Sequence, residues 1–180
     1  MKYFYDTEFI EDGKTIDLIS IGIIAEDGRE YYAVNSDMPV NRIQKEPWLC
    51  RNVIPHLPLT FTGVTEAGPY SFLFNLDRKS TLVRPEWVIA NEVREFLLAN
   101  GEPVDLWADF SAYDHVVLCQ LWGRMIDLPK GLPMRTNDFQ QKLEDMGFPA
   151  IPEQPSGLHD ALADARHLRD SFKLVSKGAA

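Results

Sequence analysis

The sequence contains few cysteines, no long apolar run and no surplus of basic residues, and each absence excludes a class of protein. Cys50 and Cys119 are the only cysteines, and they lie far apart without the CxxC or Cys/His spacing of a zinc site. No apolar run approaches the length of a membrane span, and the chain does not begin with a basic region followed by an apolar one. These features predict a reduced, cytoplasmic protein without a membrane partner.

The charge balance is acidic, with a formal net charge of −9 at pH 7. Proteins that capture nucleic acid over a broad surface normally present a basic face, so this balance argues against that mode of binding. Hydrophobic residues at 45% and charged residues at 25% are ordinary for a globular protein. The length of 180 residues predicts one domain, spanning residues 1–180, that is large enough to bury a core.

Two hairpin turns organise the start of the chain. Asp12-Gly13 and Asp27-Gly28 each lie between β-rich runs, and Asp-Gly favours a hairpin because glycine accepts a positive φ angle. We therefore predict an antiparallel three-strand meander over residues 2–10, 15–25 and 29–35.

The rest of the chain begins with a segment of irregular pattern, and predicted helices and strands alternate after it. Residues 36–83 hold five prolines with several glycines and aromatic residues, which predicts short helices and irregular loops. Pro85 and Gly101 fit the start and end of a helix. The further elements that we predict are a strand over 103–107, a helix over 111–125, a strand near 133–137, and helices over 138–146 and 159–176. This order indicates an α/β fold of three layers, with a mixed sheet flanked by helices.

Two acidic residues occupy unexpected positions in the first predicted strand. Because strand side chains alternate between faces, Asp6 and Glu8 point the same way, together with the apolar residues Phe4 and Ile10. Buried carboxylates are rare unless they are paired or bound to metal. Two simpler interpretations stay open, namely a face that is open to solvent or a salt bridge to Lys14 or Arg29 from the adjacent turns.

Two predicted helices also carry an acid on the side that should pack against the sheet. Asp114 lies in the middle of an apolar stripe, and Asp164 lies at the edge of another. Asp114 has a simpler interpretation as the partner of Ser111 in a capping box, since Ser-x-x-acid satisfies N–H groups at a helix start. Asp164 by itself would be a solvated residue at the border of an amphipathic helix.

The combination of the four acids is more informative than any one of them. Asp6, Glu8, Asp114 and Asp164 come from three segments and would repel one another in a poorly hydrated interior. A divalent metal ion is the simplest compensation, and oxygen ligands suit Mg²⁺ or Mn²⁺. Two such ions about 3.5–4 Å apart can clamp the attacking and leaving oxygens of a phosphoryl transfer. The residues alone are therefore compatible with two-metal phosphoryl chemistry.

Three segments of the sequence resemble the exonuclease motifs of a known superfamily. In order, they are Asp6-Thr7-Glu8, Ser111-Ala112-Tyr113-Asp114-His115 and His159-Asp160-Ala161-Leu162-Ala163-Asp164. They resemble the three motifs of the DEDD 3′–5′ exonucleases, and the position of His159 before Asp164 is similar to that in the DEDDh branch. The chain is most similar to the ribonuclease-T-like group of that branch.

The resemblance implies a fold, a set of cofactors and a role for each motif residue. The fold would be ribonuclease-H-like, with a five- to six-stranded mixed sheet. Two Mg²⁺ or Mn²⁺ ions would bind, with Asp6 bridging both, Glu8 and Asp164 completing one site and Asp114 supporting the other. His159 would be the general base that takes a proton from the attacking water. Many relatives are homodimers, so a homodimer is expected here.

The second motif departs from the family pattern at one position. Many relatives carry an asparagine four residues before the motif aspartate, and Phe110 stands there in this sequence. Asp109 is therefore an alternative to Asp114. We favour Asp114 because Ala-Tyr-Asp-His aligns better with the motif and because its helix face points inward.

The resemblance implies that the substrate is the 3′ end of single-stranded RNA. An enzyme that binds chain ends needs only stacking and local contacts, so the acidic charge is acceptable. We expect Thr7, Phe9 and Trp48 to contact nucleic acid, although Phe9 has an equally good interpretation as a core residue. Residues 36–83 are expected to shape substrate specificity. Two alternatives remain, a 3′–5′ exodeoxyribonuclease of the proofreading or repair type and a catalytically idle nucleic-acid-binding module of the same fold.

Overall fold

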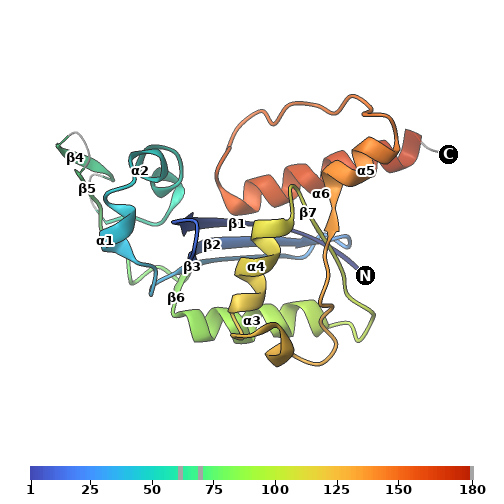
Figure 1. Cartoon of the computed structure of the whole chain (residues 1–180), viewed down its shortest axis with the longest axis horizontal. Helices are drawn as coiled ribbons and strands as arrows, with labels where there is room; N and C mark the ends of the chain where they lie inside the picture. Colours follow the sequence, from blue (N-terminus) through green and yellow to red (C-terminus); the bar gives the residue numbers. More distant parts are fainter. Residues whose placement is uncertain (61–62, 69–70, 179–180) are drawn as a thin grey trace.

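The computed structural model describes residues 1–60, 63–68 and 71–178, and within them it contains a six-stranded mixed sheet with helices on both faces (Figure 1). The strands of this sheet are β1 (Lys2–Glu11), β2 (Ile16–Ala25), β3 (Glu30–Asn35), β6 (Val83–Arg84), β7 (Asp105–Ala108) and β8 (Asn137–Asp138). The α-helices are α1 (Val40–Ile43), α2 (Pro47–Asn52), α3 (Glu86–Leu98), α4 (Ala112–Gln120), α5 (Phe139–Asp145) and α6 (Ala161–Gly178). The predicted α/β class with a five- to six-stranded mixed sheet is confirmed.

The sheet is built around the predicted meander. Its strand order is β6-β3-β2-β1-β7-β8, in which β1, β2 and β3 are antiparallel neighbours and β7 runs parallel to β1. Gly13 and Gly28 adopt φ angles of +79° and +96° in the two hairpin turns, which is why both turns tolerate no larger residue without strain. The strand predicted near 133–137 is present only as the two-residue edge strand β8.

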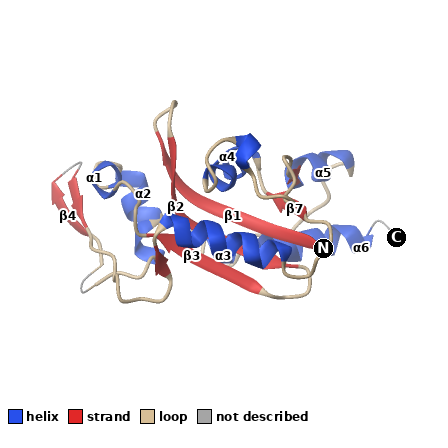
Figure 2. Cartoon of the chain, turned by 90° about the horizontal axis from the view of Figure 1, so that it is seen from below, coloured by secondary structure: helices blue, strands red, loops and turns tan. Residues whose placement is uncertain are grey.

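Helices cover both faces of the sheet and enclose two apolar cores. On one face α3 and α4 bring Ile89 and Val117 against Tyr5 and Ile23 of the sheet. Figure 2 shows α3 lying across the strands. On the other face α5 and α6 bring Phe139, Leu168 and Phe172 against Phe4 and Ile24. Neighbouring residues of these strands therefore face different cores, with Tyr5 and Ile23 on one side and Phe4 and Ile24 on the other.

The segment between β3 and α3 forms a separate layer at the end of the sheet (Figure 1). It contains α1, α2, the short 3₁₀ helix Ile54–His56 and a small antiparallel pair, β4 (Thr65–Gly68) and β5 (Ser71–Leu73). Ile43, Leu49 and Phe72 from this segment pack with Ile10 and Val34 of the sheet. The predicted short helices are confirmed, whereas the β4–β5 pair was not predicted; residues 61–62 and 69–70 lie outside the described residues.

Helix ends differ from the predicted ones for identifiable reasons. Pro85 is the cap of α3 and not its first residue, with an extended ψ of 147°. Helix α4 ends at Gln120, earlier than the predicted Met125, because the chain turns at Gly123 with a φ of +90°. Helix α6 begins at Ala161, after the predicted start at His159, since Asp160 accepts hydrogen bonds from the N–H groups of the first turn. Across the described parts of the chain, every helix is too short or too polar to traverse a lipid bilayer.

Candidate active site

Strand β1 carries the first two acids of the site on the face that α6 covers. Asp6 lines a cavity next to α6, and Glu8 is 8% exposed at the place where the pairing register of β1 with β2 shifts by one residue. Thr7 lies between them on the opposite face, toward α4. Asp6 and Glu8 therefore lie on the same face of the sheet, as the alternation of side chains along the strand predicted.

A glycine allows α6 to approach the sheet at this place. Gly22 of β2 is the register partner of Asp6, and a Cβ atom built on it would lie 2.4 Å from backbone atoms of Ala161 and Leu162. Real Cβ atoms do not approach backbone so closely, so a larger residue at position 22 would push the start of α6 away. The close contact brings the first turn of α6, and with it Asp164, next to β1.

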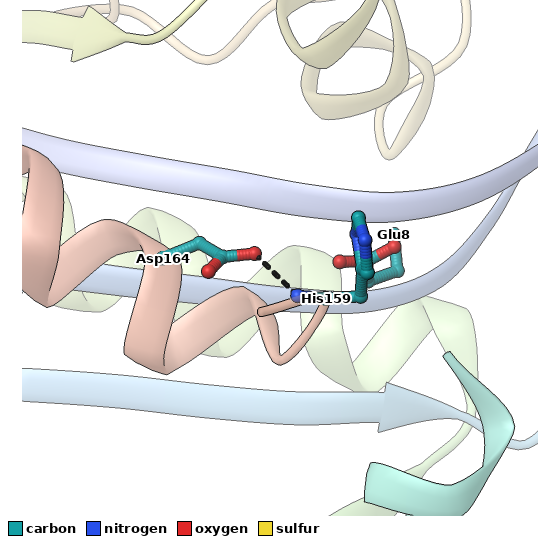
Figure 3. A group of neighbouring side chains, drawn as sticks. All are labelled: Glu8, His159 and Asp164. Carbon is teal, nitrogen blue, oxygen red and sulfur yellow. Dashed lines mark hydrogen bonds between the residues drawn. The ribbon is translucent and has the colours of Figure 1, made fainter. Parts of the chain in front are cut away.

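The turn before α6 directs His159 toward the acids. Gly157 has a φ of +74° and His159 has a φ of +67°, a left-handed backbone conformation that is uncommon for histidine. The N–H group of His159 donates to Oδ2 of Asp164 at 3.0 Å, which ties the turn to the helix (Figure 3). Such backbone strain is maintained only where surrounding contacts hold it, and it is common at functional sites.

Glu8, His159 and Asp164 form the tightest cluster of potential ligands. One carboxylate oxygen of each acid and a ring nitrogen of His159 all lie within 4.8 Å of one another. Figure 3 shows the imidazole beside the Glu8 carboxylate, with Asp164 approaching from α6. The structure thus brings together three of the five predicted catalytic residues in one group, and it places Asp6 beside Asp164 on the wall of the adjoining cavity.

Asp114 occupies a different position, on the α4 side of β1. Its Oδ1 atom accepts hydrogen bonds from the Thr7 N–H group at 2.8 Å and from the Thr7 hydroxyl at 2.7 Å. The capping-box interpretation is wrong, because the Ser111 side chain makes no capping hydrogen bond. Thr7 itself is 4% exposed, so its position favours a role in holding Asp114; its predicted contact with nucleic acid stays a prediction.

The alternative salt bridges to the acidic pair do not form among the described residues. Arg29 instead pairs with Asp27, at 2.8 Å between Nε and Oδ2. Lys14 lies in an exposed turn, where its N–H group donates to Asp12. In the described ranges, no ion pair reaches Asp6 or Glu8, so their negative charge is not neutralised by a neighbouring cation of the chain.

The four acids have raised pKa values, because burial removes their hydration and no salt bridge within the described chain offsets their charge. Loss of hydration raises the pKa of Asp6 well above its usual range, and the charges of Asp114 and Glu8 raise it further. Loss of hydration, followed by the charge of Asp164, raises the pKa of Glu8 to about 8. Burial raises the pKa of Asp114 to about 6 against the hydrogen bonds from Thr7, and burial also raises the pKa of Asp164. The site therefore attracts positive charge.

The donor set fits a hard divalent cation. Mg²⁺ binds oxygen ligands at about 2.0–2.1 Å, so two ligand atoms on one ion lie up to about 4 Å apart. Carboxylate oxygens from Glu8 and Asp164 lie within 4.8 Å of each other, and Asp6 lines the adjoining cavity, so a small rotation of these side chains would bring them onto one ion. The cluster contains no cysteine, which disfavours metal ions that prefer sulfur ligands.

Two aromatic residues, Phe9 and Trp48, line a hollow on one side of the cluster. The Trp48 ring contacts the His159 ring edge to face, with centroids 4.7 Å apart, and Phe9 stacks on Tyr113 at 5.9 Å and an interplanar angle of 10°. Phe9 and Trp48 line a hollow of about 240 Å³ together with Glu46 and Leu49. Phe9 also packs at the edge of the core, as its second interpretation predicted, and its contact with nucleic acid stays a prediction.

Asp109, the alternative motif residue, lies on the other side of the cluster. It is exposed, and its Oδ1 atom accepts a hydrogen bond from Gln140 at 2.8 Å. Loss of hydration raises its pKa, and the hydrogen bond from Gln140 opposes this shift. Asp109 and Asp6 line the same cavity, so both candidates for the second motif lie near β1.

Two residues that the sequence interpretation did not select support the cluster. Asp160 caps α6, and its signal was an aspartate directly before an apolar helical pattern. Gln154 donates from Nε2 to Oδ1 of Asp164 at 2.5 Å and to the Ser156 carbonyl at 3.2 Å. No local pattern marks Gln154, because its contact with Asp164 depends on the path of the loop before α6.

The six-stranded mixed sheet with helices on both faces defines the class of this protein as a ribonuclease-H-like fold. A solved structure of Pop2p from S. pombe, in a form with bound Mg²⁺ and Mn²⁺, superposes with a TM-score of 0.52 at 14% sequence identity, covering 98% of this chain and 82% of that chain. No protein-family model matches the chain.

Two curated proteins of Mycobacterium tuberculosis are more closely similar in sequence. They are the 3′–5′ exoribonuclease Rv2179c of strain H37Rv and the 3′–5′ exoribonuclease MT2234.1 of strain CDC 1551, each 44% identical over 177 residues. The matches cover 98% of this chain and 94% of each relative. The chain therefore belongs to the family of these 3′–5′ exoribonucleases.

Proposed function

We propose that this protein is a metal-dependent 3′–5′ exoribonuclease that removes nucleotides from the 3′ end of single-stranded RNA. The observation that carries the proposal is the cluster of Glu8, His159 and Asp164, with Asp6 beside it, in a chain 44% identical to two 3′–5′ exoribonucleases over nearly its whole length. The cluster supplies carboxylate ligands and a base, which are the two requirements of metal-assisted phosphodiester hydrolysis.

In this proposal, the acids hold two Mg²⁺ or Mn²⁺ ions. Asp6, Glu8 and Asp164 would be the direct ligands, and Asp114 would support the second ion from the α4 side, where Thr7 fixes its orientation. When bound, such ions stabilise the negative charge that develops on the phosphate and lower the pKa of water. The raised pKa values of the four acids support this assignment, because a cation would favour their charged forms.

His159 is the proposed general base. Its ring lies within 4.8 Å of the Glu8 carboxylate, so a water molecule between the acids and the imidazole is within reach of both. The imidazole would take the proton of this water as its oxygen attacks the terminal phosphodiester, and the bond to the released nucleotide would break. The edge-to-face contact with Trp48 and the hydrogen bond to Asp164 hold the His159 turn near this position.

The hollow between Phe9 and Trp48 is the proposed site of the 3′-terminal base. Base stacking on aromatic side chains is worth about 1–3 kcal/mol per base and tolerates different sequences. This mode of binding needs no broad basic surface and agrees with the net charge of −9. Residues 36–83 supply Trp48 and Glu46 to the hollow, which supports a role of this segment in substrate specificity.

The finer family assignment is also part of the proposal. We assign the chain to the ribonuclease-T-like group of the DEDDh branch, which includes the mycobacterial polyadenylate-specific 3′-exoribonuclease AS, and we propose that it acts in the cytoplasm as a homodimer. Light scattering after size exclusion tests the assembly, since a dimer has twice the chain mass of 20.5 kDa. A single species at the mass of one chain would contradict it.

The activity is tested on 5′-labelled single-stranded RNA and DNA of the same sequence, each with Mg²⁺ and with a chelator. We expect a ladder that shortens from the 3′ end of the RNA and that the chelator abolishes. Cleavage of DNA in preference to RNA would favour the exodeoxyribonuclease alternative. A protein that binds RNA without cleaving it would favour the idle binding module.

A further inference from the structure

A second hollow adjoins the acidic cluster on the side away from Phe9 and Trp48. It has a volume of about 290 Å³, close to the lower end of the range for small-molecule sites. Its apolar wall includes Phe139 and Leu168, and its polar wall consists of Asp6, Asp109, Gln154, Asp164, His167 and Ser171. An apolar wall with a few converging polar groups is the usual construction of a site for a small organic group.

Phe110 lies at the rim of this cavity with an exposed side chain and an uncommon backbone conformation. Its side chain is 72% exposed, and its backbone has a φ of +48°, in the left-handed region that bulky residues rarely adopt. An exposed aromatic ring gains nothing from burial, and the backbone conformation costs free energy. Folding stability therefore does not account for this ring at this position.

Neighbouring hydrogen bonds hold the Phe110 backbone in place from both sides. The N–H group of Ser111 donates to Oδ2 of Asp138 at 2.7 Å, and Gln140 Nε2 donates to Oδ1 of Asp109 at 2.8 Å. Asp109 and Ser111 belong to the turn between β7 and α4, whereas Asp138 ends β8 and Gln140 lies in the first turn of α5. These two segments are about 30 residues apart in sequence. The ring is thus presented by a fixed turn and not by a loose loop.

The two hollows lie on opposite sides of the cluster along β1. Asp6 lines the Phe110 cavity and Phe9 lines the other hollow, and three strand positions separate their Cα atoms by roughly 10 Å. Glu8 lies between them. A dinucleotide whose linking phosphate lies at the cluster therefore has one hollow available for each base.

We propose that the Phe110 cavity binds the penultimate nucleotide, on the 5′ side of the cleaved bond, with its base stacked on the Phe110 ring. The inference rests on the proposed function and adds a second base-binding position to it. The Phe110 ring is 72% exposed at the rim of its cavity, so the remaining RNA chain can continue past it into solvent, which assigns the 5′ side to this cavity. Asp109 and His167 offer hydrogen-bonding groups to the sugar and base edge.

The experiment combines a protein variant with a substrate that lacks one base. Three 5′-labelled RNAs share one sequence; one is unmodified, one has an abasic ribose at the penultimate position, and one has an abasic ribose at the 3′ end. The kcat/KM of the first cleavage is measured for the wild type, for Phe110→Ala and for Phe110→Trp. Phe148→Ala is the matched control, because Phe148 is also exposed (66%) with a φ of +55° and does not line the cavity.

The proposal predicts a specific pattern of losses. The penultimate abasic site and Phe110→Ala should each lower kcat/KM about tenfold, which is the size of one stacked base, and their combination should cost no more than either alone. Phe110→Trp should retain the activity, Phe148→Ala should leave all substrates unchanged, and the 3′ abasic site should add to the effect of Phe110→Ala.

Other patterns overturn the proposal. An equal effect of Phe110→Ala on the unmodified RNA and on the penultimate abasic RNA would show that the ring does not stack on that base. If Phe110→Ala and the 3′ abasic site together lowered kcat/KM no more than either alone, the Phe110 ring would stack on the 3′-terminal base, and the assignment of the two hollows would be wrong. If the wild type cleaved none of the three RNAs, the proposed function itself would fail and this inference with it.

Discussion

Gln154 and Thr7 show how the acids of the site are held before any substrate arrives. Thr7 donates hydrogen bonds from both its N–H group and its hydroxyl to Asp114, and Gln154 donates one from its side-chain amide to Asp164. Thr7 binds one oxygen of Asp114, and Asp164 accepts one hydrogen bond on each oxygen, so both carboxylates keep free lone pairs for a further partner. Residues that orient metal ligands in this way are often as important for metal affinity as the ligands themselves.

Replacement of Gln154 tests this positioning role. Gln154→Ala removes the donor at 2.5 Å from Asp164, so we expect the affinity for Mn²⁺, measured by isothermal titration calorimetry, to fall by about 10–100-fold. Gln140→Ala is the matched control, since Gln140 makes the same kind of contact with Asp109, and it should change the affinity little. Equal or tighter Mn²⁺ binding by Gln154→Ala would mean that the amide does not support the site.

The contact between α6 and β2 decides whether the acids meet. Gly22 leaves room for the first turn of α6, and Asp160 caps that turn, so Asp164 and the His159 turn arrive next to β1. The strand supplies two acids, and the helix completes the cluster from a segment more than 150 residues later in the chain. The site therefore depends on one close backbone contact.

A methyl group at position 22 tests this dependence. In Gly22→Ala the new Cβ would collide with backbone of α6, so we expect a loss of about 1–3 kcal/mol in the free energy of unfolding, measured in urea, together with loss of RNA cleavage. Gly13→Ala is the control: its φ of +79° costs about 1–2 kcal/mol, but nothing lies within 4 Å, so activity should persist. Full activity in Gly22→Ala would show that the close contact does not set the site.

The acids lower the stability of the metal-free protein as pH rises. The pKa of Glu8 rises from 4.5 to about 8 on folding, and that of Asp114 rises from 3.8 to about 6. Between the unfolded and folded pKa values the native state keeps protons that the unfolded chain has lost, so unfolding becomes easier as pH increases. The free energy of unfolding therefore begins to fall above about pH 4 and continues to fall until about pH 8.

Thermal unfolding over this range tests the charge repulsion. In a chelator, the free energy of unfolding should fall by on the order of a few kcal/mol from pH 5 to pH 8, and Mn²⁺ should restore most of it. Glu8→Gln should reduce the pH dependence of the free energy of unfolding, because glutamine does not ionise. A Tm that rises with pH in the chelator would contradict the repulsion among the acids.

Much of the architecture was predictable, because it depends on local patterns. The two Asp-Gly turns, the alternation in β1 and the order of the predicted elements were enough for the meander and the α/β class, whereas the roles of the four acids stay predictions. The partner of Asp114 was not predictable, since Ser111 offered a closer one in sequence. The Trp48–His159 contact and the presentation of Phe110 also depend on tertiary packing, which one sequence does not encode in a readable pattern.

The central claim is that the acids from β1 and α6 act together on the 3′ end of RNA. The most direct test is the rate of the first 3′ cleavage of 5′-labelled RNA in Mg²⁺, compared between the wild type and Asp164→Asn. The substitution keeps the shape of the side chain and removes its charge, so we predict a loss of roughly a thousandfold with an unchanged circular dichroism spectrum. Wild-type activity in a folded Asp164→Asn protein would contradict the account.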